Sequence, residues 1–340
     1  MDLIKSIIKR LAWSLFVLAG LSVLIFAIVM VVPGDAARMA LGPKASEETV
    51  ELYRQEHHLN DPVPKQYLHW VDGILHGDWG DSIYTKRAIV DEIREYGPVT
   101  LELILYSAIL TVGLGLLLGV VSARYKNKWP DVAIRMVSYV GIATPAFVVA
   151  LFLILIFGYW FAIMPTIGSR VAAGIAVQRI TGMITIDAVL TGNWQAFWSG
   201  LACLLPPAFA LSLGSFMQEA KVTRSSMVDY ENKDFILLAR SQGIPARKIN
   251  SKYLLKPSAI PTVSIMGLDI ASLFGNAFIV EQIFNWPGLS RYGLTAMLQK
   301  DLNAICAVVL CTGIFFVVCN ILVDIMVLVL DPRVRYSHSR

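Results

Sequence analysis

The sequence predicts an all-α integral membrane protein with six transmembrane helices and both termini in the cytoplasm. Of its 340 residues, 56% are apolar and only 16% are charged, whereas soluble domains contain about 25% charged residues. The apolar residues gather in six long stretches, and basic residues gather in alternate connecting segments. The formal net charge of +4 is too small for a nucleic-acid-binding surface. Composition therefore disfavours both a soluble enzyme and a nucleic-acid partner.

Each apolar stretch is long enough to cross the hydrocarbon core of a bilayer, which takes roughly 20 residues of helix. The first follows Lys5, Lys9 and Arg10 and is longer than the ~7–15 apolar residues of a secretory signal, so we interpret it as an uncleaved anchor. The fourth contains Pro206 and Pro207, which we expect to break its helical hydrogen-bond ladder. The predicted spans are Leu11–Val32, Val99–Ala123, Val137–Met164, Gly200–Met217, Ala259–Phe284 and Ala304–Leu330.

The connecting segments alternate in charge. Arg124–Arg135 holds four basic residues against one acidic residue, and Glu219–Lys256 holds eight against four. Val32–Pro98 instead holds seven basic against twelve acidic residues. Because Lys- and Arg-rich segments stay in the cytoplasm, we place the two basic segments inside, together with both termini. This divides the chain into an anchor plus extracytoplasmic helical segment (residues 1–98) and a five-helix core with a cytoplasmic loop at residues 219–256 (residues 99–340).

The long outside segment predicts two short helices of its own. Ser46 suits the N-cap of a helix that ends at Glu56, because acidic residues follow in its first turn. Lys65–Leu75 predicts the second helix. A metal-binding cluster of histidines is conceivable here, but neither a cysteine nor a His-x-x-x-His spacing accompanies them, so we interpret them as ordinary surface or packing residues. These histidines are His57, His58, His69 and His76.

The cytoplasmic segment predicts two short helices joined at a glycine. Asp234 suits the start of the first helix, and Gly243 suits the C′ position after its end, where a positive φ is needed. Pro245 suits the first turn of the second helix. An apolar tip on the first helix is either a docking surface for a soluble partner or an interfacial helix on lipid. The residues that we expect to be exposed there are Phe235, Ile236 and Leu238.

Signatures of catalysis and of nucleotide binding are absent from the sequence. It contains no phosphate-binding G-x-x-x-x-G-K-[ST], no H-E-x-x-H and no G-x-S-x-G. Its four cysteines lie in apolar runs without C-x-x-C spacing, which argues against a zinc site and a disulfide framework. We therefore expect no enzymatic activity, no metal site and no cofactor in this chain. If transport is driven by ATP, the ATPase must be another chain.

Polar residues inside the spans are candidate functional residues. An ionisable group in the hydrocarbon region is unfavourable unless it faces water or the interior of the bundle. Asp269 lies near the middle of the fifth span, and Ser272 and Asn276 follow it on the same helix face. This stripe predicts part of the lining of a substrate pathway. Hydrogen bonding between helices is the alternative.

Two further patterns inside the spans predict packing rather than ligand binding. Asn320 and Asp324 are one turn apart in the last span and predict a structural brace. Gly115 and Gly119, four residues apart in the second span, permit the close approach of another helix.

Short motifs occur along the chain in the order typical of one family of transporters. They are Pro33–Asp35, Thr100–Leu103, Thr144–Phe147, Thr223–Met227 with Asp229 and Tyr230, Ala239–Gly243, Trp286–Arg291 and Asp331–Arg335. With them the chain, from about Arg10 to Tyr336, resembles the permeases of the dipeptide/oligopeptide/nickel branch of ABC importers. The general loop pattern of ABC permeases begins Glu-Ala-Ala, and this chain departs from it with Leu237, Leu238 and Ala239.

The resemblance implies a type I importer permease fold in a prokaryotic cytoplasmic (inner) membrane, and a pathway for peptides or a related small solute. It also implies a coupling helix that sits in a groove of an ATP-binding subunit. The implied partners are a second homologous permease, two cytoplasmic ATP-binding subunits, an extracytoplasmic solute-binding protein and membrane lipid. ATP and Mg²⁺ would be bound by the ATP-binding subunits. The alternative is a self-sufficient secondary transporter or channel, which would favour inverted repeats. The implied coupling residues are Asp234, Phe235, Leu238, Ala239 and Gly243.

Overall fold

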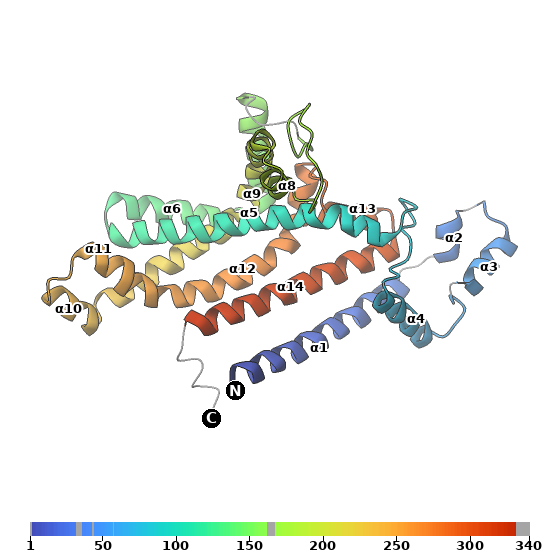
Figure 1. Cartoon of the computed structure of the whole chain (residues 1–340), viewed down its shortest axis with the longest axis horizontal. Helices are drawn as coiled ribbons and strands as arrows, with labels where there is room; N and C mark the ends of the chain where they lie inside the picture. The colour runs from blue at the N-terminus through green and yellow to red at the C-terminus, as the bar shows by residue number, and fades with distance from the viewer. Residues whose placement is uncertain (1, 32–35, 43, 57, 162–166, 331–340) are drawn as a thin grey trace.

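Long helices lying side by side form the body of the protein (Figure 1). The structure is a computed structural model and describes residues 2–31, 36–42, 44–56, 58–161 and 167–330. Helices α1, α5, α12 and α14 run along the long axis of the molecule, and α9 packs against both α5 and α12. The helices are α1 (Asp2–Val31), α2 (Ala36–Leu41), α3 (Glu47–Glu56), α4 (Val63–His76), α5 (Ile89–Arg124), α6 (Trp129–Ala143), α7 (Ala146–Leu153), α8 (Ile184–Leu190), α9 (Trp194–Glu231), α10 (Asp234–Ser241), α11 (Ala246–Lys248), α12 (Leu255–Ile283), α13 (Leu289–Leu298) and α14 (Leu302–Leu330), with π-helical segments η1 (Ile154–Trp160) and η2 (Ile249–Leu254).

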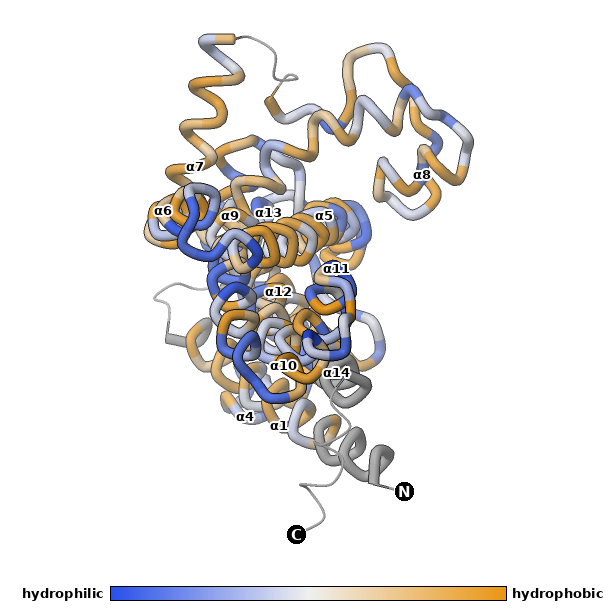
Figure 2. The backbone as a smooth tube through the Cα atoms, turned by 90° about the vertical axis from the view of Figure 1, so that its left-hand side faces the viewer, coloured by the Kyte–Doolittle hydropathy of each residue, from blue (hydrophilic) through white to orange (hydrophobic). Residues whose placement is uncertain are grey.

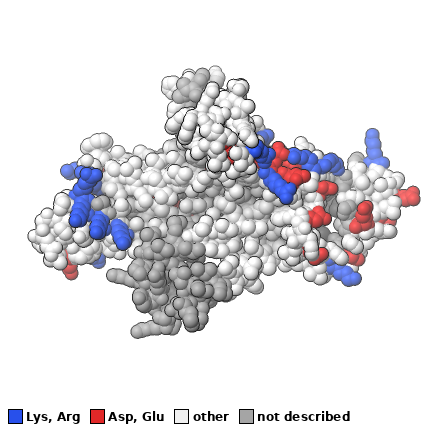
Figure 3. All heavy atoms as spheres, viewed as in Figure 1, with Lys and Arg blue, Asp and Glu red and all other residues white. Residues whose placement is uncertain are grey.

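Charged side chains gather at the two ends of the molecule. Figure 3 shows Lys and Arg at the end that carries α10 and α11, and residues of both signs at the opposite end, near α2, α3 and α4, with a broad uncharged belt between them. Among the described residues, five helices are long and apolar enough to cross a membrane, and one bent pair of helices makes a sixth candidate. The all-α membrane fold predicted from the sequence is therefore confirmed.

The third predicted span, Val137–Met164, is wrong as one continuous helix. It consists of α6 and of α7 with η1, which are bent by 106° relative to each other. Pro145 explains the break, because its ring disfavours helical geometry at the preceding residue, and Thr144 has an extended conformation with ψ 119°. Figure 2 shows α7 leaving the row of long helices.

The helix that contains the fourth span is longer than the sequence predicts and continues without interruption. Helix α9 continues through Pro206 and Pro207, so the loss of hydrogen bonds predicted at these two residues does not end the helix. Pro207 is buried, and packing against neighbouring helices stabilises α9 at the positions where the two prolines donate no backbone hydrogen bond. The predicted end at Met217 is also wrong, because α9 extends to Glu231. The cytoplasmic segment predicted to begin at Glu219 therefore starts inside a helix.

Two glycines allow α5 and α9 to pack closely, as their spacing predicts. A Cβ atom added at Gly115 would lie 2.8 Å from the Cβ of Glu219. A Cβ atom added at Gly119 would lie 2.5 Å from the Cβ of Thr223 and 2.9 Å from the carbonyl oxygen of Ala220. Both separations are too short for carbon atoms in contact, so the two helices can reach this distance only with glycine at these positions.

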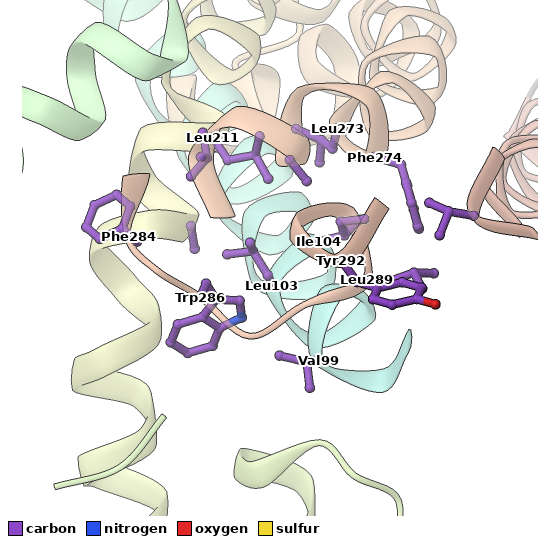
Figure 4. Packing of buried hydrophobic residues seen from close by; sticks show 14 of the residues in the cluster. Val99, Leu103, Ile104, Leu211, Leu273, Phe274, Phe284, Trp286, Leu289 and Tyr292 are labelled. Atoms are coloured by element: carbon purple, nitrogen blue, oxygen red, sulfur yellow. The ribbon is translucent and has the colours of Figure 1, made fainter. Parts of the chain in front are cut away.

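The main hydrophobic core joins α5, α9, α12 and α13. Figure 4 shows Leu103 of α5, Leu211 of α9 and Leu273 of α12 meeting there, with Trp286 from the turn between α12 and α13 and Leu289 from the first residue of α13. Each of these five side chains is at most 3% exposed. The turn is therefore part of the core rather than a surface loop.

The first predicted outside helix agrees with the structure at its cap. Ser46 accepts a hydrogen bond from the backbone N–H of Thr49 (3.2 Å), as an N-cap residue does. The second outside helix is α4, whose Trp70 and Ile74 pack near Ile25 of α1. In the last span, the amide of Asn320 donates to a carbonyl of its own helix, and the side chain of Asp324 lies outside the described residues.

Substitution of Gly119 by alanine tests the contact between α5 and α9. Alanine favours a helix over glycine by about 1 kcal/mol, but at position 119 its methyl group overlaps Thr223, and we expect a net loss of about 1–3 kcal/mol. Gly113→Ala is the matched control, because a Cβ atom there meets no other atom within 4 Å. Thermal unfolding of the two purified variants in detergent measures the difference. Equal stability would show that the helices do not depend on this contact.

Candidate functional site

The polar stripe on α12 consists of one half-buried residue and two exposed ones. Asp269 is half-buried, whereas Ser272 and Asn276 are exposed on the next two turns. The hydroxyl of Ser272 donates to the backbone carbonyl of Asp269 (2.7 Å), within the same helix. Among the described residues, neither Ser272 nor Asn276 forms a side-chain hydrogen bond with another helix. An exposed polar stripe on an apolar spanning helix suits water or another protein better than lipid.

Glu219 of α9 lies beside Asp269, and the sequence pattern did not predict it. The two carboxylates are close enough to interact electrostatically, and Glu219 is fully buried. Within the described residues, both oxygens of Glu219 and Oδ2 of Asp269 have no hydrogen-bond partner. Ala220, Thr223 and Met227 of α9 are buried as well, and the burial of Glu219 depends on Gly115 of α5, which the sequence of α9 alone does not reveal.

Helix α10 presents apolar side chains on one face and packs into the protein with the other. Phe235 (43%) and Leu238 (58%) are exposed, as is the neighbouring Leu237. Ile236 and Ala239 are buried in a small core that also contains Met227, Ile249 and Leu254. The predicted exposure of Ile236 is therefore wrong, because positions 236 and 239 share the inner face of a helix.

The end of α10 has the geometry that its glycine predicts. Gly243 has φ +73°, and its N–H donates to the carbonyl of Arg240 (3.0 Å) while the N–H of Ile244 donates to that of Ala239 (3.2 Å). The guanidinium of Arg240 also donates to Glu231 at the end of α9 (3.0 Å). Asp234 is exposed at the start of the helix, as expected. These bonds hold α10 in a defined position at the end of α9.

At the opposite end of the bundle, buried carboxylates hold the connecting segments. Glu102 of α5 accepts from the guanidinium of Arg170 (2.7 Å) and from the backbone N–H and hydroxyl of Thr185 (2.6 and 2.7 Å). Burial acts to raise the pKa of Asp187 on α8, but hydrogen bonds from Thr181 and from the backbone of the same turn outweigh it, so the pKa is lowered. The ion pair between Arg170 and Glu102 thus attaches the segment after η1 to α5. Asp187 stabilises a turn within the same segment by accepting hydrogen bonds from its backbone N–H groups.

Two of the motifs that are far apart in the sequence meet at a second buried carboxylate. Glu281 at the end of α12 accepts from the hydroxyl of Thr100 (2.6 Å) and from the backbone N–H of Arg291 (2.8 Å). The hydroxyl oxygen of Thr100 in turn accepts from the N–H of Leu289 (2.7 Å). A Cβ atom at Gly288 would overlap the Glu281 carboxylate, so only glycine fits there.

A third carboxylate joins helices near α10. Asp131 of α6 accepts two hydrogen bonds from the guanidinium of Arg224 on α9 (2.6 and 2.8 Å). It also accepts from the hydroxyl of Ser122 on α5 (2.6 Å) and from the backbone N–H of Asn127 (2.8 Å). Thus α5, α6 and α9 are tied together at one residue. The motifs Pro33–Asp35 and Asp331–Arg335 lie outside the described residues.

Comparison with known proteins assigns this architecture to a family. Residues 115–336 match the family described as "Binding-protein-dependent transport system inner membrane component", and residues 3–103 match the family described as the N-terminal part of such membrane components. The chain is 34% identical over 331 residues to the probable D,D-dipeptide transport system permease protein of Escherichia coli, with 97% of each chain covered. It is 31% identical over 337 residues to the glutathione transport system permease protein of Shigella flexneri, covering 98% of this chain and 100% of the relative.

These matches extend over nearly the whole chain, and they favour an ATP-driven importer over the alternative of a self-sufficient secondary transporter. Permeases of such importers are not themselves enzymes and bind no cofactor, and they work with other components of the transporter. The chain therefore belongs to the family of binding-protein-dependent transport system inner membrane components, and it is a multi-pass permease subunit of an ABC importer.

Proposed function

We propose that this permease pairs with a second homologous permease and that the polar stripe of α12, formed by Asp269, Ser272 and Asn276, lines an import pathway for peptides. The observation that carries the proposal is the combination of this exposed stripe with the unpartnered acid Glu219 behind it. The two relatives named above are described as transporting a D,D-dipeptide and glutathione. Peptides of this kind carry a cationic amino group, which complements carboxylates.

The charge of Asp269 needs compensation from outside this chain. In the described part of the protein, no Lys, Arg or His side chain forms an ion pair or hydrogen bond with Asp269 or Glu219. A carboxylate buried among apolar helices is unfavourable without a counter-charge or water. The compensating group is therefore water, the partner permease or the amino group of the solute. This is why we assign the stripe to the pathway rather than to packing.

The exposed face of α10 suits a cytoplasmic partner. Phe235, Leu237 and Leu238 form an apolar surface on a helix whose position is held by Arg240 and Gly243. An amphipathic helix with such a face binds in a hydrophobic groove. We assign this groove to an ATP-binding subunit, one of two in the transporter, which also binds ATP and Mg²⁺. When ATP binding closes the ATPase pair, the coupling helices follow and the two permeases exchange inward-open for outward-open states.

The same assignment gives the orientation in the membrane. The basic end with α10 and α11 faces the cytoplasm, and the end with α2, α3 and α4 faces outward, where a solute-binding protein delivers the solute. Residues 1–98 then form the anchor with its extracytoplasmic segment, and residues 99–340 form the five-helix core.

Single-cysteine labelling in intact cells tests this orientation. We expect an impermeant maleimide to label Glu51→Cys, on the exposed surface of α3, and to leave Lys248→Cys, on α11, unlabelled until the cells are permeabilised. The four native cysteines lie in the spans and are first replaced by serine or alanine in a background that still assembles. Labelling of position 248 in intact cells would reverse the orientation.

Replacement of Asp269 by asparagine tests the pathway. The change keeps the size of the side chain and removes its charge, and charged hydrogen bonds contribute about 1.5–3 kcal/mol. We therefore expect uptake of an amine-bearing peptide per assembled complex to fall about tenfold or more. Asp72→Asn, at an exposed position on α4, is the control and should transport normally.

The yield of assembled complex and the transport rate per complex are measured on the same preparation of the Asp269→Asn variant. If Asp269 only holds helices together, the yield of detergent-extracted complex falls and the rate per complex stays that of the parent. That result would remove Asp269 from the pathway.

Replacement of Gly243 tests the coupling helix. A Cβ atom at this position meets no other atom within 4 Å, so only the positive φ restricts the residue. Gly243→Val should raise the energy of this conformation by about 1–2 kcal/mol or more, whereas Gly243→Asn should be tolerated, because asparagine adopts it more readily. We expect only the valine variant to lose stimulation of the ATPase subunits. Equal ATPase activity of both variants would show that the end of α10 does not govern coupling.

A further inference from the structure

Three potential metal ligands converge between α3 and α4, far from the pathway. They are His58, Asp61 and His69, and their ligand atoms all lie within 4.8 Å of one another. The Asp61 carboxylate oxygen Oδ2 is 3.6 Å from Nδ1 of His58 and 3.8 Å from Nε2 of His69. The two imidazole rings are stacked, with centroids 4.4 Å apart and planes inclined by only 7°. Two ring nitrogens therefore face one carboxylate.

The backbone holds these ligands in place without any ion. His58 has φ +55°, in the left-handed region that usually takes glycine. Its carbonyl accepts from the N–H of Asp61 (3.1 Å), which closes the turn. The side-chain amide of Gln66 on α4 donates to the carbonyls of Leu59 (3.0 Å) and Asp61 (2.7 Å), so the turn is attached to α4. His69 follows Gln66 by about one helical turn and lies on the same side of α4.

On the neighbouring helix α3, the cationic side chain of Arg54 donates to Glu51 (3.0 Å), and Asn60 donates to the same carboxylate (2.8 Å). Asp61 is 35% exposed and the two imidazoles are 55% and 53% exposed. Water can therefore occupy the remaining coordination positions of an ion bound here.

We propose that His58, Asp61 and His69 bind one divalent transition-metal ion such as Zn²⁺. Imidazole and carboxylate ligands suit this class of ion. With bonds of about 2.0–2.1 Å, neighbouring ligands of a tetrahedral ion lie roughly 3.3 Å apart. The observed 3.6 and 3.8 Å reach this value with side-chain rotations alone. The ion would tie the end of α3 to α4 in the segment that we place outside the membrane.

This proposal departs from the interpretation of the histidines as ordinary surface residues. The sequence separates the ligands between a turn and a helix, so no short motif reveals them, and the fold brings them together. The adjacent His57 lies outside the described residues. The proposal does not depend on the assignment of the transport pathway, because none of its three ligands belongs to the polar stripe of α12.

A Zn²⁺ titration of the full-length chain in detergent, purified without a histidine tag, tests the proposal. Competition with a chromophoric chelator measures both stoichiometry and affinity. We expect one equivalent of Zn²⁺ to bind the parent chain, and His58→Gly and His69→Ala to weaken binding by at least tenfold. His58→Gly is chosen because glycine suits the positive φ, so the turn is retained while the ligand is lost.

His76→Ala is the matched control. His76 lies on the same helix and faces Asp72, with 3.4 Å between Nδ1 and Oδ1, but the described structure places no second histidine in that pair. We expect this variant to bind Zn²⁺ like the parent. We also expect Zn²⁺ to raise the unfolding temperature of the parent and of His76→Ala, and not that of His58→Gly. Parent-like Zn²⁺ affinity in His58→Gly and His69→Ala would overturn the proposal, as would an equal loss in His76→Ala.

Discussion

The close contact between α5 and α9 is the constraint on which the rest of this structure depends. Gly115 and Gly119 remove the side chains that would hold the two helices apart, and the backbone of α9 lies against the gap. This approach buries Glu219 against α5 and leaves Asp269 of α12 beside it. The same helix then continues to Glu231, where Arg240 attaches α10. Packing at two glycines thus sets the position of the part of α9 that carries Glu219 and leads to α10.

Five carboxylates of the helical bundle differ in their surroundings. At the ends of the bundle, Glu102, Glu281 and Asp131 each receive several hydrogen bonds and join segments that are distant in the sequence. Near the middle, Glu219 and Asp269 have oxygen atoms without a hydrogen-bond partner among the described residues. A fully bonded carboxylate stabilises a fold, whereas an unpartnered one retains its capacity to bind. The contrast separates the carboxylates that join segments of the permease from the pair beside the stripe that we propose to line the pathway.

Features that depend on neighbouring residues could be predicted from the sequence, and features that depend on distant ones could not. The long apolar stretches, the Ser46 cap and the positive φ of Gly243 follow from local chemistry and agree with the structure. The bend at Pro145 was missed because the apolar pattern continues across it. The burial of Glu219 depends on glycines of another helix, which no local pattern of α9 contains. The polar stripe of α12 could thus be found from the sequence, but the burial of Glu219 could not.

The continuity of α9 has a mechanical consequence. Its 38 residues make a rod of about 57 Å at a rise of 1.5 Å per residue. A pivot at one end by as little as 5° moves the other end by roughly 5 Å, which is close to one full helical turn. The bidentate Arg224–Asp131 pair compels α6 to follow this movement. In the proposed mechanism, a push on α10 by a cytoplasmic subunit moves the attached end of α9, and the continuous helix carries this displacement to Glu219 without any local unfolding.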